Sequence, residues 1–288
     1  MSDLATIDLH MHSTVSDGTQ TPDEILQSVR DAGLTTFSLT DHDAVKGCQV
    51  ISGLLTDQDP AFIRGVEFSC KDGNGRYHIL GYGYDPDSAA IQRVIMTGHR
   101  YRMNKVNARL DFLKKEFGFD FPEEELYKLF HLDNPGKPHV ANLMVKYGFA
   151  ATKDDAIRHY INRIHFGSEY VTPREAIEGI TEAGGMPVLA HPSYGSGDQI
   201  VTGDEMDARL KRLIGFGLRG VEAFYSGFTK KLRDEMLRFS EKYDLYVTAG
   251  SDYHGANKMV ILADTGLDEV DAYPAAMERF LADVSIVS

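Results

Sequence analysis

Two pairs of metal-binding residue types, near opposite ends of the sequence, are the first features that could do chemistry. His10 and His12 lie in residues 7–12, where apolar and polar side chains alternate as they do in a strand. Residues two apart on a strand point to one face, so both imidazoles can bind one metal ion. Asp252 and His254 repeat this spacing after a second apolar run. Together the two pairs indicate a metal site that joins both ends of the chain.

Further potential ligands follow other apolar segments, and they are Asp41, His42, Glu67, His78 and His191. Glu67 stands between Val66 and Phe68, where burial of a carboxylate is costly unless it is paired or bound to metal. A position that bridges two cations would meet this requirement.

Asp17 has two interpretations. Within Ser16-Asp17-Gly18 it could be an ordinary turn residue, because Asp-Gly is a common turn pair. Its place shortly after the paired histidines favours a metal ligand instead. The histidines that we expect at the surface or in packing contacts are His99, His131, His159 and His165.

Short strands and helices must position these residues. The sequence predicts strands at residues 7–12, 36–40, 62–66, 77–82, 186–190, 220–224 and 245–249. Helices alternate with them, and two begin with the capping sequences Thr21-Pro22-Asp23-Glu24 and Thr172-Pro173-Arg174-Glu175. This alternation predicts a parallel sheet, open or closed into a barrel. In a barrel the loops that follow the strands converge on one face, so most of the polar residues above would meet there.

Residues 88–170 interrupt the alternation, because they look helical and contain no clear buried strand. We expect residues 1–87 and 171–288 to form the barrel, and residues 88–170 to form an inserted helical subdomain that caps the substrate. The insertion is basic: residues 92–165 hold 13 Lys and Arg against 9 Asp and Glu, in a chain of net charge −13. This charge could be a solvated helix face, or a surface that attracts anions to an active site.

Composition limits the class of protein. The chain has 288 residues, 42% of them hydrophobic and 25% charged, which fits one large domain or a domain with an insertion. The net charge argues against broad nucleic-acid binding. No apolar run approaches the roughly 20 residues of a membrane helix, and residues 1–6 lack a signal-peptide pattern. Two cysteines, Cys48 and Cys70, suit a reducing compartment. We therefore expect a cytoplasmic protein without membrane association, and we infer no obligate protein partner.

Taken in order, these motifs resemble those of the PHP (polymerase and histidinol phosphatase) family. The resemblance is carried by residues 8–13, 16–19, 21–22, 39–43, 65–67, 78–81, 190–192 and 250–254. It covers nearly the whole chain, and the motifs are specific in combination although each alone is not. The resemblance implies a metal-dependent phosphoesterase with a distorted (β/α)7 TIM-like barrel and three divalent ions, which would be manganese, zinc or iron.

The resemblance also implies how nine ligands divide among the three ions, with one glutamate as a bridge. The implied sets are His10, His12, Glu67 and Asp252; then Glu67, His78 and His191; and then Asp17, His42 and His254. The expected catalytic residues are His191, Asp252 and His254, with a metal-bound hydroxide as the nucleophile. Six positive charges against three carboxylates would leave a cationic site that suits a phosphate.

Within the family, the inserted segment resembles that of nucleoside 3',5'-bisphosphate phosphatases and of 5'-to-3' exonucleases that act on short oligonucleotides. We expect the chain to hydrolyse phosphomonoesters, with a nucleotide as the substrate and the insertion holding the phosphate that does not react. The candidate substrate-binding residues are Arg100, Arg102, Asn104, Lys137 and His139.

Several alternatives stay open at this point. A 5'-3' exonuclease would release mononucleotides from a short single-stranded oligonucleotide, and a histidinol-phosphate-type phosphatase is a weaker option within the family. A non-catalytic metal-binding or proofreading module would bind metal without turnover. A C–N hydrolase of the amidohydrolase type also uses paired histidines in a barrel, but it generally has a metal-bridging lysine, and no lysine stands at a predicted strand end.

Overall fold

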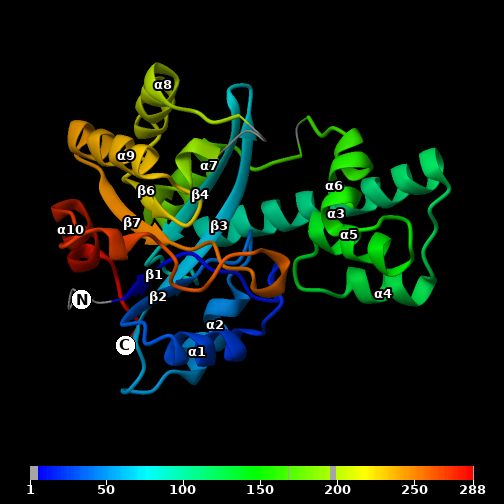
Figure 1. Cartoon of the computed structure of the whole chain (residues 1–288), viewed down its shortest axis with the longest axis horizontal. Helices are drawn as coiled ribbons and strands as arrows, with labels where there is room; N and C mark the ends of the chain where they lie inside the picture. Colours follow the sequence, from blue (N-terminus) through cyan, green and yellow to red (C-terminus); the bar gives the residue numbers. More distant parts are fainter. Residues whose placement is uncertain (1–5, 168, 195–198, 288) are drawn as a thin grey trace.

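The computed structural model describes residues 6–167, 169–194 and 199–287; residues 1–5, part of the segment without a signal-peptide pattern, lie outside this range. Within it, seven strands form one sheet in the order β1 to β7. Their bounds are β1 Ile7–Asp8, β2 Thr36–Leu39, β3 Ala61–Asp72, β4 Gly75–Tyr82, β5 Met186–Leu189, β6 Gly220–Tyr225 and β7 Tyr246–Gly250. The sheet curls until its first and last strands meet, because the Leu9 amide donates to the Ala249 carbonyl at 2.9 Å and Met11 pairs with Tyr253. The predicted α/β barrel is confirmed (Figure 1).

The strand β4 is the exception to the parallel arrangement that strand–helix alternation predicts. It runs antiparallel to both β3 and β5. Asp72 pairs with Gly75, so only two residues connect β3 to β4. A parallel crossover needs roughly a dozen residues or more, and this connection can therefore form only a hairpin. The hairpin places two candidate ligands, Glu67 and His78, on neighbouring strands.

The helices that flank the sheet are α1 Pro22–Asp31, α2 Lys46–Leu54, α7 Pro173–Glu182, α8 Gly203–Ile214, α9 Lys230–Tyr243 and α10 Ala275–Asp283. Both predicted capping boxes are present at the starts of α1 and α7. The amide of Thr21 donates to Glu24 at 2.8 Å, and Thr172 and Glu175 repeat this contact at 2.8 Å. Single turns of 3-10 helix follow in the loops, at η1 Ile161–Arg163, η2 Pro192–Tyr194, η3 Gly255–Asn257 and η4 Leu267–Glu269.

Between β4 and α7 the described chain is helical and contains no strand. Its helices are α3 Ala89–Phe117, α4 Glu123–Phe130, α5 Lys137–Lys146 and α6 Lys153–His159. The first turns of α3 pack in the barrel core through Ile91 and Val94, whereas Val106 and Leu113 belong to a separate apolar cluster with α4, α5 and α6. These helices gather around the far half of α3, beside the barrel (Figure 1). None of the described helices combines the length and the apolar character that crossing a membrane requires.

Candidate active site

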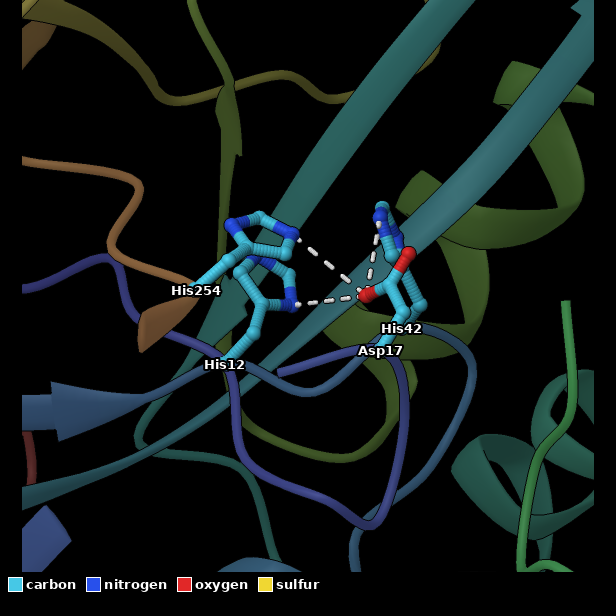
Figure 2. Close-up of side chains that lie close together, drawn as sticks. All are labelled: His12, Asp17, His42 and His254. Carbon is cyan, nitrogen blue, oxygen red and sulfur yellow. Dashed lines mark ion pairs between the residues drawn. The ribbon is translucent and has the colours of Figure 1, made fainter. Parts of the chain in front are cut away.

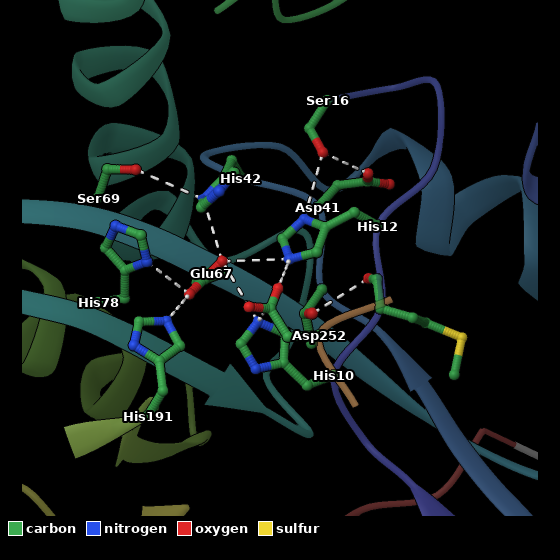
Figure 3. A network of polar contacts seen from close by, with 12 residues as sticks. His10, His12, Ser16, Asp41, His42, Glu67, Ser69, His78, His191 and Asp252 are labelled. Carbon is green, nitrogen blue, oxygen red and sulfur yellow. Dashed lines mark hydrogen bonds and ion pairs between the residues drawn. The ribbon is translucent and has the colours of Figure 1, made fainter. Parts of the chain in front are cut away.

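Glu67, buried on β3, is the centre of a cluster of histidine side chains (Figure 3). Its Oε2 lies 3.1–3.3 Å from a ring nitrogen of three histidines, which are His10, His12 and His42. Its Oε1 lies 2.8 Å from Nδ1 of His78 and 3.2 Å from Nε2 of His191. One carboxylate thus contacts imidazoles from β4 and from the loops after β1, β2 and β5.

Asp17 is the centre of a second group, formed where the loop after β1 approaches two other loops (Figure 2). Its Oδ1 lies 3.4 Å from Nε2 of His254, 3.9 Å from Nδ1 of His12 and 4.0 Å from Nε2 of His42. The side chain of Asp17 is buried. The structure therefore brings Asp17 to the other candidate ligands and does not leave it as a solvent-exposed turn residue.

Asp252 turns its two oxygens in different directions. Oδ1 faces the histidines, at 3.6 Å from Nε2 of His10, 3.4 Å from Nε2 of His12 and 3.4 Å from Nδ1 of His254. Oδ2 accepts a hydrogen bond from the Tyr225 hydroxyl at 3.0 Å and pairs with a lysine, discussed below. All nine predicted ligand side chains are thus in one contact network.

The donor set fits divalent metal ions. Within the part of the chain that the structure describes, three compact groups can each surround a cation: His12, Asp17, His42 and His254; His10, His12 and Glu67; and His42, Glu67 and His78. His191 and Asp252 lie outside these groups but contact members of them. Among the described residues, several buried polar atoms make no hydrogen bond, including Nε2 of His10, Nε2 of His12 and Oδ1 of Asp17. Buried polar atoms without a hydrogen bond are costly, and bound cations would satisfy these.

Beside this cluster is a cavity of about 320 Å³ with a cationic wall. Asp17, His42 and His78 line it on the cluster side. The cations that line it are Arg76, Arg102, Lys105, Arg109 and Lys137, from β4, α3 and α5. The candidate ligands and the cations therefore share one space.

The sequence of this chain is also similar to those of known proteins. Residues 8–209 match the profile of the PHP domain. The chain belongs to the PHP domain family. A 3',5'-nucleoside bisphosphate phosphatase of Chromobacterium violaceum is 27% identical over 87% of this chain and 88% of its own length. A 5'-3' exoribonuclease of Haemophilus influenzae is 27% identical over 95% of this chain and 98% of its own length.

The fold of this PHP chain is also that of a solved relative. A structure described as a putative metal-dependent phosphoesterase from Bifidobacterium adolescentis superposes with a TM-score of 0.81 at 24% identity, covering 99% of this chain and 98% of the other. PHP phosphoesterases are metal-dependent hydrolases, so this chain is an enzyme that acts on phosphoric ester bonds.

Only part of the predicted substrate-binding set lines the cavity of the PHP chain. Arg102 and Lys137 do, whereas Arg100, Asn104 and His139 do not. Nδ1 of His139 instead accepts a hydrogen bond from the Gly136 amide at 3.0 Å. The helix geometry of α3 explains the first difference: Arg100 and Asn104 are each two residues from Arg102, which is a turn of about 200° around the axis. They consequently point away from the face that Arg102 presents.

Three cations of the cavity were missed in the sequence, namely Arg76, Lys105 and Arg109. Lys105 and Arg109 are three and seven residues after Arg102, a spacing that puts side chains on one helix face. Counting basic residues along α3 did not separate this face from the others. The helical period is the signal that could have found them.

Four of the five cations that line the cavity lack a carboxylate partner among the described residues. Within the described residues, no Asp or Glu oxygen lies within ion-pair distance of Arg76, Lys105, Arg109 or Lys137; Arg102 pairs with Asp43 at 3.4 Å. Lys105 lies 3.6 Å from the centre of the Tyr170 ring, an aromatic contact that leaves its charge uncompensated. Burial lowers the pKa of Lys105 to about 7, against the opposing effect of Asp43. Uncompensated buried cations indicate a place for an anion.

Glu222, on β6, supports the cluster from behind and was also missed. Its side chain is fully buried; Oε1 lies 2.9 Å from Nδ1 of His10, and Oε2 accepts from the His191 amide at 2.7 Å. Gly250 makes room for this arrangement, since a Cβ there would lie 2.5 Å from Glu222 Oε1 and 2.2 Å from the Cβ of His10. A carboxylate in the middle of the apolar β6 segment was the available signal.

Asp41 performs a similar task for His12. Its Oδ1 accepts from the Ser16 hydroxyl at 2.7 Å, and that hydroxyl lies 3.4 Å from Nδ1 of His12. The Ser13 amide donates to the same Oδ1 at 2.8 Å. Asp41 was grouped with the potential ligands in the sequence, and the structure places it behind them instead (Figure 3).

Burial and neighbouring charges shift the pKa values of the residues in the cluster. Burial alone would lower the pKa of His10, but the carboxylates of Glu222 and Glu67 outweigh it and raise the pKa well above its ordinary value. Asp252 and Glu67 likewise outweigh burial at His12 and raise its pKa to about 9. The surrounding histidines hold the pKa of Glu67 well below its usual range although burial opposes them. A metal that binds His10 and His12 must therefore displace protons from these two imidazoles.

Proposed function

We propose that this PHP protein hydrolyses phosphomonoesters of nucleotides, with nucleoside 3',5'-bisphosphates as the substrate class. The observation that carries the proposal is the shared cavity: Asp17, His42 and His78 line one side of it, and five cations, of which only Arg102 pairs with a carboxylate among the described residues, line the other. A substrate with two phosphate groups can place one at the candidate metal ligands and the other at the cations. The C. violaceum relative, named as a bisphosphate phosphatase, supports this substrate class.

The residues proposed to hold the metal ions are the nine of the contact network. We assign three ions to them, with Glu67 shared between two sites because its oxygens contact histidines on both sides. When bound, divalent ions stabilise the charge that develops on a phosphoryl group and acidify water near neutral pH. Glu222 and Asp41 orient His10 and His12 toward the ions, as buried carboxylates commonly do for metal-bound imidazoles.

The phosphate that does not react is proposed to bind Lys105, Arg109 and Lys137. Arg109 is almost fully buried, and its Nε makes no hydrogen bond among the described residues. Lys137 Nζ donates a hydrogen bond to the Asn162 side chain at 3.2 Å and has no carboxylate partner among the described residues. Residues 88–170 therefore serve as a substrate cap in this proposal, because α3 and α5 supply these cations.

A second candidate, exonuclease activity on short oligonucleotides, is favoured by the H. influenzae relative, which is named a 5'-3' exoribonuclease. The cavity size favours the first candidate. About 320 Å³ lies near the lower limit for small-molecule sites, which suits one small group better than a polymer.

To test the proposal, the purified chain is loaded separately with manganese, zinc and iron. Each preparation is assayed with adenosine 3',5'-bisphosphate, adenosine monophosphate and a 5'-phosphorylated trinucleotide. The proposal expects inorganic phosphate from the bisphosphate, with a kcat/KM well above that for the monophosphate. Mononucleotide release from the trinucleotide at equal or greater efficiency would support the exonuclease activity instead of the phosphatase activity. No turnover with any metal would contradict both candidate functions.

A further inference from the structure

Lys258, in the loop after β7, contacts the metal-ligand candidate Asp252. Its ammonium pairs with Oδ2 of Asp252 and lies 3.1 Å from the Tyr225 hydroxyl, which donates to the same oxygen at 3.0 Å. The side chain of Lys258 is 34% exposed, so it lies at the margin of the site and in reach of a ligand. Neither the metal-ligand assignment nor the cationic cavity accounts for it.

The charge of Lys258 is unfavourable for metal binding alone. Oδ1 of Asp252 faces His10 and His12, where a dication is proposed. A fixed ammonium on the other oxygen of that carboxylate repels the dication and so weakens metal binding. Asp252 is also its one carboxylate partner among the described residues, and metal binding would draw on the same negative charge. The presence of Lys258 is explained if its charge serves to bind an anion that approaches the cluster.

The position of Lys258 indicates that this anion is the phosphoryl group under attack and not the second phosphate. The cavity that would hold the second phosphate is lined by Asp17, His42 and His78, and Lys258 does not line it. Lys258 lies instead on the β6–β7 side, with Tyr225, whose ring centre is 5.4 Å from that of His191. Lys258 is therefore a cation beside the ligand cluster that is separate from the cations of the cavity wall.

We propose that Lys258 is a catalytic residue whose ammonium binds a non-bridging oxygen of the phosphoryl group under attack. The step rests on the proposed phosphoesterase function. Water adds to phosphorus, the bond from phosphorus to the ester oxygen breaks, and the released alcohol keeps a proton that came from that water. The Lys258 side chain takes no part in the proton transfer and lowers the energy of the charge that builds on the phosphoryl oxygens. Tyr225 is a positioning residue that keeps the ammonium beside the cluster.

The test compares Lys258→Met and Lys258→Arg with wild type in the metal-loaded full chain. Lys230→Met is the matched control, because Lys230 is an exposed lysine paired with Asp234 on α9. Three quantities are measured: kcat on p-nitrophenyl phosphate and on adenosine 3',5'-bisphosphate, the affinity for inorganic phosphate by calorimetry, and the metal affinity by chelator competition.

The proposal expects Lys258→Met to lower kcat about 100-fold on both esters, the loss typical of removing one charge-stabilising donor. Phosphate affinity should fall as well, metal affinity should equal or exceed that of wild type, and Lys258→Arg should recover part of the activity. Lys230→Met should match wild type in all three measurements.

Three results would overturn the proposal. A fall in metal affinity that accounts for the lost activity would make Lys258 a support for Asp252 only. A loss confined to the bisphosphate, with p-nitrophenyl phosphate unaffected, would make it a proton donor to the poorer leaving group. Unchanged kcat and phosphate affinity would remove any role. If wild type hydrolyses neither ester, the proposed function fails, and equal phosphate affinity in wild type and Lys258→Met then rejects this inference separately.

Discussion

Oε1 of Glu222 lies 2.9 Å from Nδ1 of His10, and neither side chain is exposed to solvent. This contact leaves Nε2 of His10 facing Glu67. The other oxygen of Glu222 holds the His191 amide, and His191 has a positive φ of 26° that is uncommon for a side-chain-bearing residue. One buried carboxylate thus fixes two candidate ligands that are far apart in sequence.

Replacing Glu222 with glutamine should weaken metal binding. The amide has nearly the same shape but lacks the charge that orients His10, and loss of such an outer contact typically costs about 10–100-fold in metal affinity. Chelator competition with zinc measures the effect, and circular dichroism checks the fold. Glu241→Gln, at an exposed position on α9, is the control. Wild-type affinity in a folded Glu222→Gln protein would show that the contact does not position a ligand.

Gly250→Ala should destabilise the protein. The added methyl would lie 2.2 Å from the Cβ of His10 and 2.5 Å from Glu222, closer than atoms pack, so we expect a loss of at least about 2 kcal/mol in the free energy of unfolding. Urea denaturation measures it. Gly53→Ala, within α2 and with open space around its Cβ, should be neutral or stabilising. Equal stability of the two variants would contradict the expectation.

Binding of the non-reacting phosphate should weaken as pH rises from 6 to 9. Burial lowers the pKa of Lys105 to about 7, so this lysine is charged below that pH and loses its proton above it. An anion binds the charged form, and KM for the bisphosphate should therefore increase with pH. Lys105→Arg stays charged throughout, and its KM should rise less. Parallel pH profiles for the two proteins would exclude Lys105 from the binding site.

Lys137→Ala and Arg109→Ala should each raise KM for the bisphosphate. A hydrogen bond to a charged group is worth about 1.5–3 kcal/mol, which corresponds to an increase of roughly 10- to 100-fold. KM for a monophosphate, which leaves the cation site unfilled, should change little. Arg100→Ala is the control, because Arg100 is an exposed residue of α3 outside the cavity. An equal effect of all three changes would point to general electrostatics instead of a site.

Adding metal should stabilise the chelator-treated protein. A ligand that binds only the folded state at 100 times its Kd contributes about 2.7 kcal/mol, so Tm should rise with metal concentration. Asp17→Asn removes a carboxylate from the group with His42 and His254 and should reduce this rise. Thermal denaturation with and without manganese measures it. An identical rise in the variant would show that no ion uses Asp17.

It could be predicted from the sequence that the candidate ligands meet in one place, because metal-binding residue types stand at or near the ends of the predicted strands. His10 and Asp252 follow apolar strands, and a barrel gathers such positions on one face. Glu67 follows the strand expected at residues 62–66, but β3 continues to Asp72, so Glu67 lies within it. Their mutual contacts follow from this rule without any knowledge of loop conformation. The antiparallel β4 was not predicted, although the two-residue connection from Asp72 to Gly75 contains the information.

Residues that act from the surroundings of the site were harder to predict. Glu222 faces inward on β6, and Lys258 is six residues beyond Asp252, so their partners are set by tertiary packing and not by local sequence. Arg100 and Arg109 have the same residue type and belong to the same helix, yet they differ in exposure because the helix turns between them. Residue type alone cannot separate such positions.

The continuity of α3 has a consequence for which molecules this enzyme accepts. The helix is buried in the barrel core through Ile91 and in the helical cluster through Leu113, and an uninterrupted helix curves only gently. The distance between the cations it carries and the candidate metal ligands is therefore fixed. In relatives that gain or lose one turn of this helix, this distance would change by about 5.4 Å. We expect such relatives to prefer compounds whose phosphates are spaced differently.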